Sequence, residues 1–82
     1  MSAAKWYNEH KMTNSSSLKT IGRKLREARE KQHLTQVEVA EKSDISTNHY
    51  AQIERGEANA SIGTLENILK ALNVKSSKIL PF

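Results

Sequence analysis

The chain has 82 residues, of which 37% are hydrophobic and 27% are charged, and it contains no cysteine. A chain of this length is expected to make one small domain with a modest core, and the lack of cysteine excludes disulfides and thiolate metal sites. Thirteen Lys and Arg residues against nine Asp and Glu give a net charge of +4, a mildly basic balance that permits nucleic-acid binding without establishing it. No apolar run approaches membrane-spanning length and no secretion signal is evident, so we expect a cytoplasmic protein with no membrane partner.

Residues 1–17 show no sustained period and end in the polar tract Asn14-Ser15-Ser16-Ser17. This pattern predicts a flexible N-terminal arm, with residues 18–82 as the folded domain. Trp6 and Tyr7 are the only large aromatic side chains of the arm. They leave two interpretations open: a disordered extension, which we favour, or an arm that packs on a partner subunit or follows the DNA groove.

A first long helix is predicted over Leu18–Gln32, with Ser17 as its N-cap. Ile21, Leu25 and Ala28 are spaced four and three apart and form its buried stripe. The segment is rich in basic residues, which are Arg23, Lys24, Arg26, Arg29 and Lys31. His33 follows as the residue that ends the helix, and we interpret it as a C-terminal residue and not a metal ligand.

The stretch from Thr35 to Gly56 predicts two short helices joined by a tight turn. The first spans about Gln36–Lys42 with Thr35 as N-cap, and the second begins at Thr47 with Ser46 as N-cap. Asp44 lies in the turn and is one of the few non-glycine residue types that tolerate a left-handed backbone. Two helices that cross through so short a turn form a helix-turn-helix.

The apolar residues of this stretch fit that geometry, because each helix carries them on one side. Val39 and Ala40 lie on the first helix, Tyr50 and Ile53 lie on the second, and Ile45 is expected to fill the gap between them. The residues left facing outward on the second helix are Thr47, Asn48, His49 and Gln52. They carry hydrogen-bonding groups without a formal charge, which suits contacts with base edges.

Ser61 is predicted to cap a strongly periodic helix, which Asn73 ends in a left-handed conformation. The apolar positions of this helix are Ile62, Leu65, Ile68, Leu69 and Leu72. Val74–Phe82 then predicts a short helical turn opened by Ser76 or Ser77. Its apolar residues, Ile79, Leu80 and Phe82, either complete the core of the subunit or form a dimer interface, which is the sharper hypothesis.

Four stretches together carry a family resemblance: Leu34-Thr35-Gln36, Val39-Ala40-Glu41-Lys42, Ile45-Ser46 and Ile53-Glu54-Arg55-Gly56. They resemble the helix-turn-helix of phage Cro and repressor proteins, also called the xenobiotic-response-element family. The similarity covers about Ile21 to Val74, and residue type and spacing agree at many positions. This sequence departs from the pattern at Asp44, where glycine is usual, and at Ala60, where proline is frequent.

The resemblance implies an all-α, lambda-repressor-like domain of four main helices plus a short C-terminal turn. It implies a transcriptional regulator, most simply a repressor, that binds double-stranded DNA at a palindromic operator as a homodimer. Such a regulator would respond mainly to its own concentration, as phage repressors and the controller proteins of restriction-modification systems do.

The resemblance also assigns roles to individual residues. Gln36 would contact a phosphate and brace the recognition helix, and Arg55 would bind a phosphate. An ion pair between Arg29 and Glu54 would tie the first helix to the end of the third. The DNA-binding set as a whole is Gln36, Ser46, Thr47, Asn48, His49, Gln52 and Arg55, in which Thr47, Asn48 and Gln52 match base-contacting positions.

Enzyme chemistry finds little support. His10, His33 and His49 are scattered, no pair has metal-ligand spacing, and no glycine-rich phosphate loop is present, so we expect no cofactor and no metal.

Two alternatives remain open. One is an antitoxin that binds its own promoter and a toxin. The other is an interaction module without DNA binding, which is favoured by the net acidic charge of residues 34–56.

Overall fold

The computed structural model describes residues 15–80, and these form helices and connecting loops without strands. The helices are α2 (Ser15–Lys31), α3 (Gln36–Lys42), α4 (Thr47–Glu54), α5 (Ile62–Leu72) and α6 (Ser76–Ile79). The all-α fold of four main helices and a short C-terminal turn is therefore confirmed for this part of the chain. No helix within residues 15–80 is long and apolar enough to cross a membrane.

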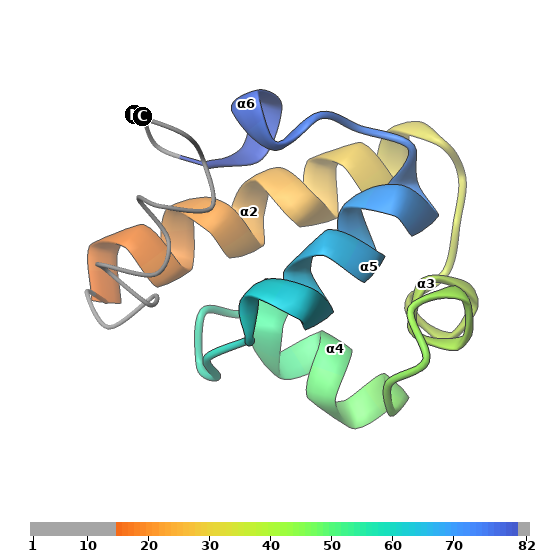
Figure 1. Ribbon diagram of the computed structural model, residues 1–82, viewed down its shortest axis with the longest axis horizontal. Helices are drawn as coiled ribbons and strands as arrows, with labels where there is room; N and C mark the ends of the chain where they lie inside the picture. Colours follow the sequence, from red (N-terminus) through yellow and green to blue (C-terminus); the bar gives the residue numbers. More distant parts are fainter. Residues whose placement is uncertain (1–14, 81–82) are drawn as a thin grey trace.

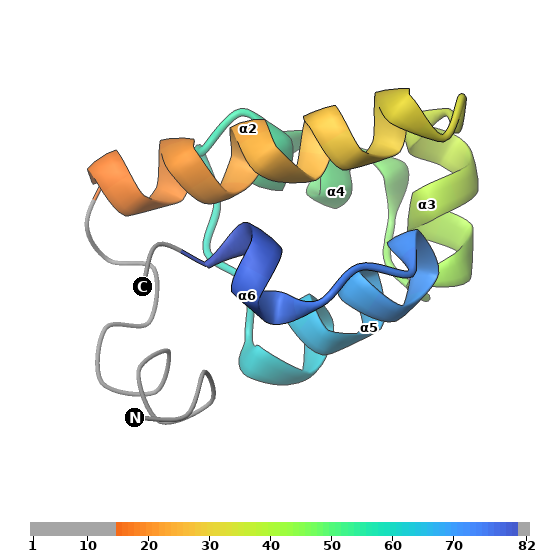
Figure 2. The ribbon, with the colours of Figure 1, turned by 90° about the horizontal axis from the view of Figure 1, so that it is seen from above.

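The long helix α2 lies across the molecule and contacts helices on two sides (Figure 1). Helix α4 lies below it and α6 lies above it in this view, while α3 closes one end. Viewed from above, α6 is nearest to the reader and α4 lies behind α2 (Figure 2). The apolar faces of the helices meet in one core, whose most completely buried side chains include Ile21, Leu25, Val39, Tyr50, Ile53, Leu65, Ile68 and Leu72.

The predicted starts of three helices are confirmed. The hydroxyls of Thr35, Ser46 and Ser61 each accept a hydrogen bond from the backbone N–H three residues later, which satisfies a donor that has no partner inside the helix. At α3 the side chain of Glu38 also accepts from the Thr35 N–H at 2.9 Å, and this completes a capping box.

The four main helices end in the same way. A residue with positive φ follows each helix, and the next N–H bonds to a carbonyl in the last turn, as in the Schellman motif. Three of these positions hold non-glycine residues, His33 (φ 59°), Asp44 (φ 58°) and Asn73 (φ 53°), and the fourth is Gly56 (φ 72°). The left-handed conformations expected at Asp44 and Asn73 are thus present, and His33 adopts one as well.

Two predictions about the ends of the domain need correction. Helix α2 begins at Ser15, so Ser17 lies inside it and is not its N-cap. Consecutive serines offer several equivalent caps, so the pattern could not choose among them. The remainder of the predicted arm, residues 1–14, lies outside the described residues.

Ile79 and Leu80 are each only 2% exposed and belong to the core of this subunit. Side chains buried within one chain leave no surface for a partner, so these two residues do not form the expected dimer interface. Their alternative role, completion of the subunit core, is the one that the structure shows. Phe82 lies outside the described residues.

Candidate nucleic-acid interface

The turn between α3 and α4 is built from backbone hydrogen bonds and one apolar anchor. The left-handed Asp44 reverses the chain, and the Ile45 N–H donates to the Ala40 carbonyl at 3.1 Å. Ile45 packs against the core from within the turn, as expected. The angle at which α4 leaves α3 is therefore fixed by a closed turn whose apolar side chain is partly buried against the core.

Helix α4 has a buried face and an outward face. Tyr50, Ile53 and Glu54 point inward and are buried. Asn48 on the other face is exposed, and Thr47, His49 and Gln52 beside it are half-buried. The four polar residues singled out in the sequence thus all lie on α4 and all reach the surface, and α4 lies at the edge of the molecule (Figure 1).

Of the three remaining predicted residues, Gln36 is the first residue of α3, and Ser46 and Arg55 lie at the two ends of α4. Ser46 is the N-cap, and its Oγ accepts from the His49 N–H at 3.0 Å. Arg55 is exposed just after the helix, where its Nε donates to Glu57 Oε1 at 2.9 Å. An exposed pair of this kind is weak, so the guanidinium can exchange this carboxylate for a phosphate at little cost.

The expected Arg29–Glu54 ion pair is present and joins α2 to the last residue of α4. Arg29 Nε lies 2.6 Å from Glu54 Oε2, and a second bond from Nη2 to Oε1 measures 3.1 Å. The two side chains are only 13% and 3% exposed. A bidentate pair shielded from water fixes both partners in orientation as well as position.

Two further bonds extend this pair to α3. Gln36 Nε2 donates to Glu54 Oε1 at 3.0 Å, and Arg29 Nη1 donates to the Leu34 carbonyl at 2.9 Å. Glu54, at the end of α4, therefore accepts hydrogen bonds from side chains of both α2 and α3. This arrangement connects the helix-turn-helix to the long helix through a single carboxylate.

The carboxylate is ionised in the folded protein. Burial by itself raises the pKa of Glu54, but the bonds from Arg29 and Gln36 outweigh it and hold the pKa below its ordinary value. The adjacent buried Tyr50 has a raised pKa, first through desolvation and then through the negative charge of Glu54. The Tyr50 hydroxyl has no hydrogen-bond partner in the described structure.

Close backbone contact also fixes α4 against α2. A Cβ atom built on Gly22 would lie 2.3 Å from the Glu54 carbonyl oxygen and 2.6 Å from that of Ile53. Only glycine permits this approach. Gly22 is absent from the residues expected to be functional, although a glycine in a helix interior is costly enough to suggest a packing role.

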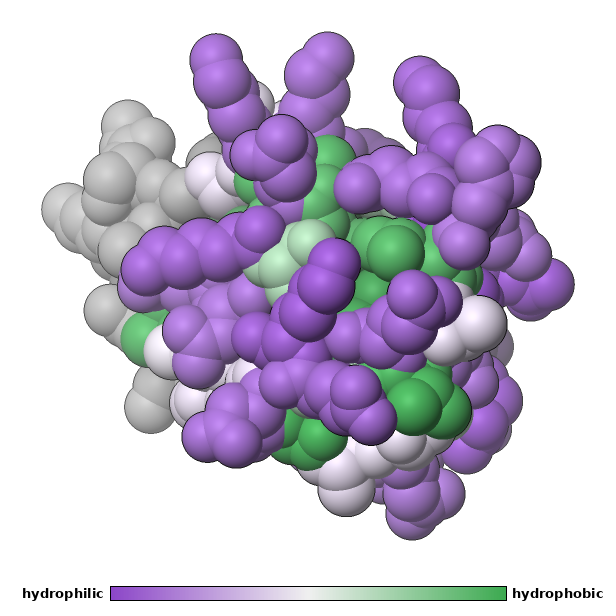
Figure 3. All heavy atoms as spheres, turned by 90° about the vertical axis from the view of Figure 1, so that its right-hand side faces the viewer, coloured by the Kyte–Doolittle hydropathy of each residue, from purple (hydrophilic) through white to green (hydrophobic). Residues whose placement is uncertain are grey.

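The surface around α3 and α4 carries few positive charges. Within residues 34–56, Lys42 and Arg55 stand against four carboxylates, Glu38, Glu41, Asp44 and Glu54. Glu54 is buried and paired with Arg29, which removes it from the exposed total. The side of the molecule that includes α3 is mostly hydrophilic, with small separate apolar patches (Figure 3). Val37, at 49% exposure, is the only large hydrophobic residue that is exposed among residues 15–80.

Within the described residues, no group of three His, Asp or Glu side chains could hold a metal ion. The surface of α4 in turn carries hydrogen-bonding side chains without a formal charge. The last residue of this helix, Glu54, is held by Arg29 and Gln36.

Comparison with known proteins identifies the same region. A helix-turn-helix family model matches residues 25–79. The control protein C.BamHI of Bacillus amyloliquefaciens is 36% identical over 72 residues, which cover 87% of this chain and 88% of that protein. The immunity repressor of Bacillus phage phi105 is 39% identical over 61 residues, which cover 74% of this chain and 42% of the repressor. The chain thus aligns with less than half of that repressor.

Solved structures show the same fold. The restriction-modification controller C.AhdI from Aeromonas hydrophila superposes with a TM-score of 0.76 at 26% identity, over 79% of this chain and 98% of the controller. The controller C.Esp1396I, solved as a tetramer with its natural 35-base-pair operator, gives a TM-score of 0.68 at 30% identity, over 73% of this chain and 79% of that one. The chain belongs to the helix-turn-helix family of the Cro and repressor type.

Proposed function

We propose that the protein is a sequence-specific DNA-binding transcriptional regulator that represses by occupying an operator. The observation that carries this proposal is the outward face of α4, where Thr47, Asn48 and Gln52 stand together without a formal charge. Amide side chains can pair bidentately with adenine, and a threonine methyl can contact thymine. A helix of this composition is suited to enter a major groove.

The neighbouring residues would position α4 on the duplex. Ser46 and His49 at the start of α4, and Arg55 after its end, lie where phosphates flank a groove-bound helix. Gln36 donates one amide hydrogen bond to Glu54, and its second amide hydrogen would be directed to a phosphate. Gln36 would thus couple backbone contact to the orientation of the recognition helix.

We further propose that two chains bind a palindromic operator in the cytoplasm as a homodimer. Two-fold symmetry places two recognition helices in successive major grooves about one helical turn apart. The C.Esp1396I complex, in which a relative assembles on its operator, supports a multi-chain complex. The dimer surface would differ from the one expected, because Ile79 and Leu80 are buried in the core of the subunit.

The proposal is tested by selection from a random duplex library, followed by footprinting and by sizing of the complex. The expected result is a two-fold-symmetric site occupied by two chains, with affinity that falls steeply as salt rises because counterions are released. If no sequence is enriched at low salt, the proposal of sequence-specific DNA binding is contradicted, and a protein-interaction module becomes the better interpretation.

A further inference from the structure

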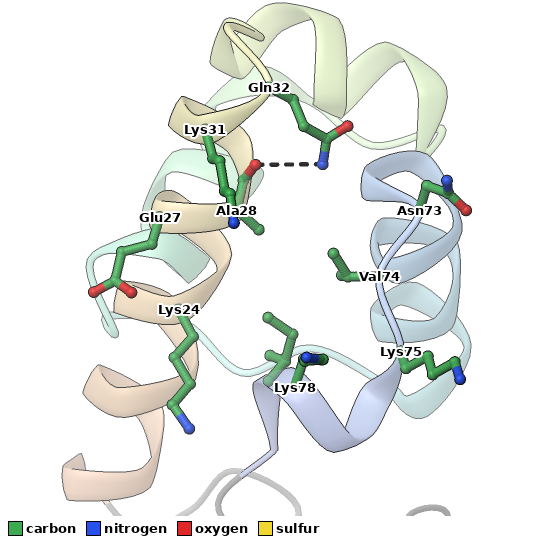
Figure 4. Close-up of a pocket in the computed structure, with 10 residues that line it drawn as sticks. Lys24, Glu27, Ala28, Lys31, Gln32, Asn73, Val74, Lys75 and Lys78 are labelled. Carbon is green, nitrogen blue, oxygen red and sulfur yellow. Dashed lines mark hydrogen bonds between the residues drawn. The ribbon is translucent and has the colours of Figure 1, made fainter.

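A basic groove lies between α2 and the end of the chain. It has a volume of about 550 Å³ and is lined by α2, the α5–α6 connection and α6 (Figure 4). Its apolar members are Ala28, Val74 and Ile79, which pack with the core. Four lysines also line the groove, which are Lys24, Lys31, Lys75 and Lys78, and of these Lys75 extends away from its centre (Figure 4).

The positive charge of this groove is not neutralised by the protein. Glu27 is the one acidic residue of the lining, and it pairs with Arg23 at 2.7 Å and points away from the groove (Figure 4). None of the four lysines has a carboxylate within 4.0 Å among residues 15–80. Like charges without counter-ions around one groove attract anions. They also repel one another, which raises the free energy of the protein when no anion is bound in the groove.

The groove faces away from the recognition helix. Helix α6 lies on one side of α2 and α4 on the other (Figure 1), and the view onto α6 places α4 behind α2 (Figure 2). A duplex held by the outer face of α4 would therefore not reach Lys78 on α6. Phosphate contacts of the proposed operator complex leave these lysines unexplained.

We propose that this groove docks an acidic peptide segment of another protein, which places an apolar side chain on the half-buried Ala28 and Val74 and carboxylates beside the lysines. The combination of an apolar floor and a positive rim selects this chemistry, because a nucleic-acid backbone offers phosphates but no projecting apolar side chain for the floor. Opposite charges would steer the segment and fix its orientation, while the apolar contact would supply affinity. The groove and α4 can be occupied together, so the inference does not depend on the operator.

The test uses a displayed library of random peptides of about 15 residues, long enough for several helical turns, selected on the full chain at low salt. A selected peptide is then synthesised with a fluorescent label and compared with two variants of itself, one with Lys for each acidic residue and one with Ser for its apolar anchor. We expect selected peptides to combine acidic residues with Leu, Ile or Phe. Both altered peptides should bind at least about tenfold more weakly.

Three protein variants locate the site. The double substitution Lys24→Glu with Lys78→Glu should weaken peptide binding by about tenfold or more, since it replaces attraction by repulsion across the groove. The single substitution Lys78→Glu is compared with the control Lys42→Glu. The control makes the same charge change on exposed α3, outside the groove, and should leave peptide affinity within about twofold. Circular dichroism melting verifies that each variant is folded.

Three results would overturn the inference. They are enrichment of peptides without acidic residues, equal loss of peptide binding in the Lys42→Glu control, and displacement of the peptide by random duplex DNA with reduced DNA affinity in the groove variant. The last result would make the groove a second nucleic-acid surface. Because binding to the selected operator is measured separately, failure of the groove and failure of the proposed function give different outcomes.

Discussion

Arg29 and Glu54 are 25 residues apart in the chain, yet their side chains meet in a bidentate ion pair at 2.6 and 3.1 Å. Through this pair the long helix α2 holds the last residue of the proposed recognition helix. Gln36 joins it from α3, so three helices share one carboxylate. The orientation of α4 thus depends on a polar contact behind the surface that would read DNA.

We expect Arg29→Ala to lower the free energy of unfolding by about 3 kcal/mol, because it leaves the buried Glu54 carboxylate without its counter-ion. The melting temperature should fall by more than about 10 °C in so small a domain. Arg23→Ala is the matched control, since the Arg23–Glu27 pair is 61% and 60% exposed and should contribute little. Equal melting temperatures for the two variants would show that the buried pair does not stabilise the fold.

The same pair predicts a pH dependence. The pKa of Glu54 is lowered in the folded state, so the unfolded chain binds a proton more readily and stability increases with pH in this range. The contribution of Glu54 is present above its ordinary pKa of 4.5 and is lost as the pH falls through the lower folded value. Denaturant titrations below pH 4.5 should show a weaker decline in Glu54→Gln than in the wild type. Parallel curves would show that Glu54 is not the group responsible for the loss of stability at low pH.

Gly22→Ala should destabilise the protein by about 1–3 kcal/mol, because the new methyl group would collide with the backbone carbonyls of Ile53 and Glu54. Gly63→Ala provides the control in another helix, where the nearest atom to the added Cβ is 3.9 Å away. There the gain in helix propensity should make the change neutral or stabilising by up to about 1 kcal/mol. Chemical denaturation of both variants measures the difference, and a tolerated Gly22→Ala would contradict the close approach of α2 and α4.

His33→Gly should stabilise the protein by about 0.5–1 kcal/mol. His33 has a φ of 59° at the end of α2, a conformation that costs an L-residue about 1–2 kcal/mol, and part of that gain is offset by the greater freedom of glycine in the unfolded chain. Asn73→Gly, at φ 53°, should gain less because asparagine tolerates this conformation. A loss of stability in His33→Gly would indicate that the imidazole makes a contact that outweighs the backbone cost.

The parts of the fold that sequence could predict are those fixed by local chemistry. Thr35, Ser46 and Ser61 act as caps through bonds to residues three positions away, and such short-range bonds are readable from spacing. The start of α2 was misplaced because several neighbouring serines are equivalent. Ile79 and Leu80 were assigned to an interface because an apolar pattern shows that a side chain is buried but not against which surface.

Contacts between distant residues were harder to predict. The resemblance implies the Arg29–Glu54 pair and a bracing role for Gln36, but the bond from Gln36 to Glu54 spans 18 positions and has no local signature of its own. The approach of Gly22 to α4 and the convergence of Lys24 and Lys78 on one groove depend on how helices pack. Only the folded chain brings them together.

The most direct test of the central claim compares Asn48→Ala and Gln52→Ala with the wild type on the selected operator and on random duplex DNA. If the outer face of α4 reads bases, each substitution should cost about 1–3 kcal/mol on the operator and leave the affinity for random DNA nearly unchanged. Equal losses on both kinds of DNA, or no loss on either, would contradict the assignment of this face as the sequence-reading surface.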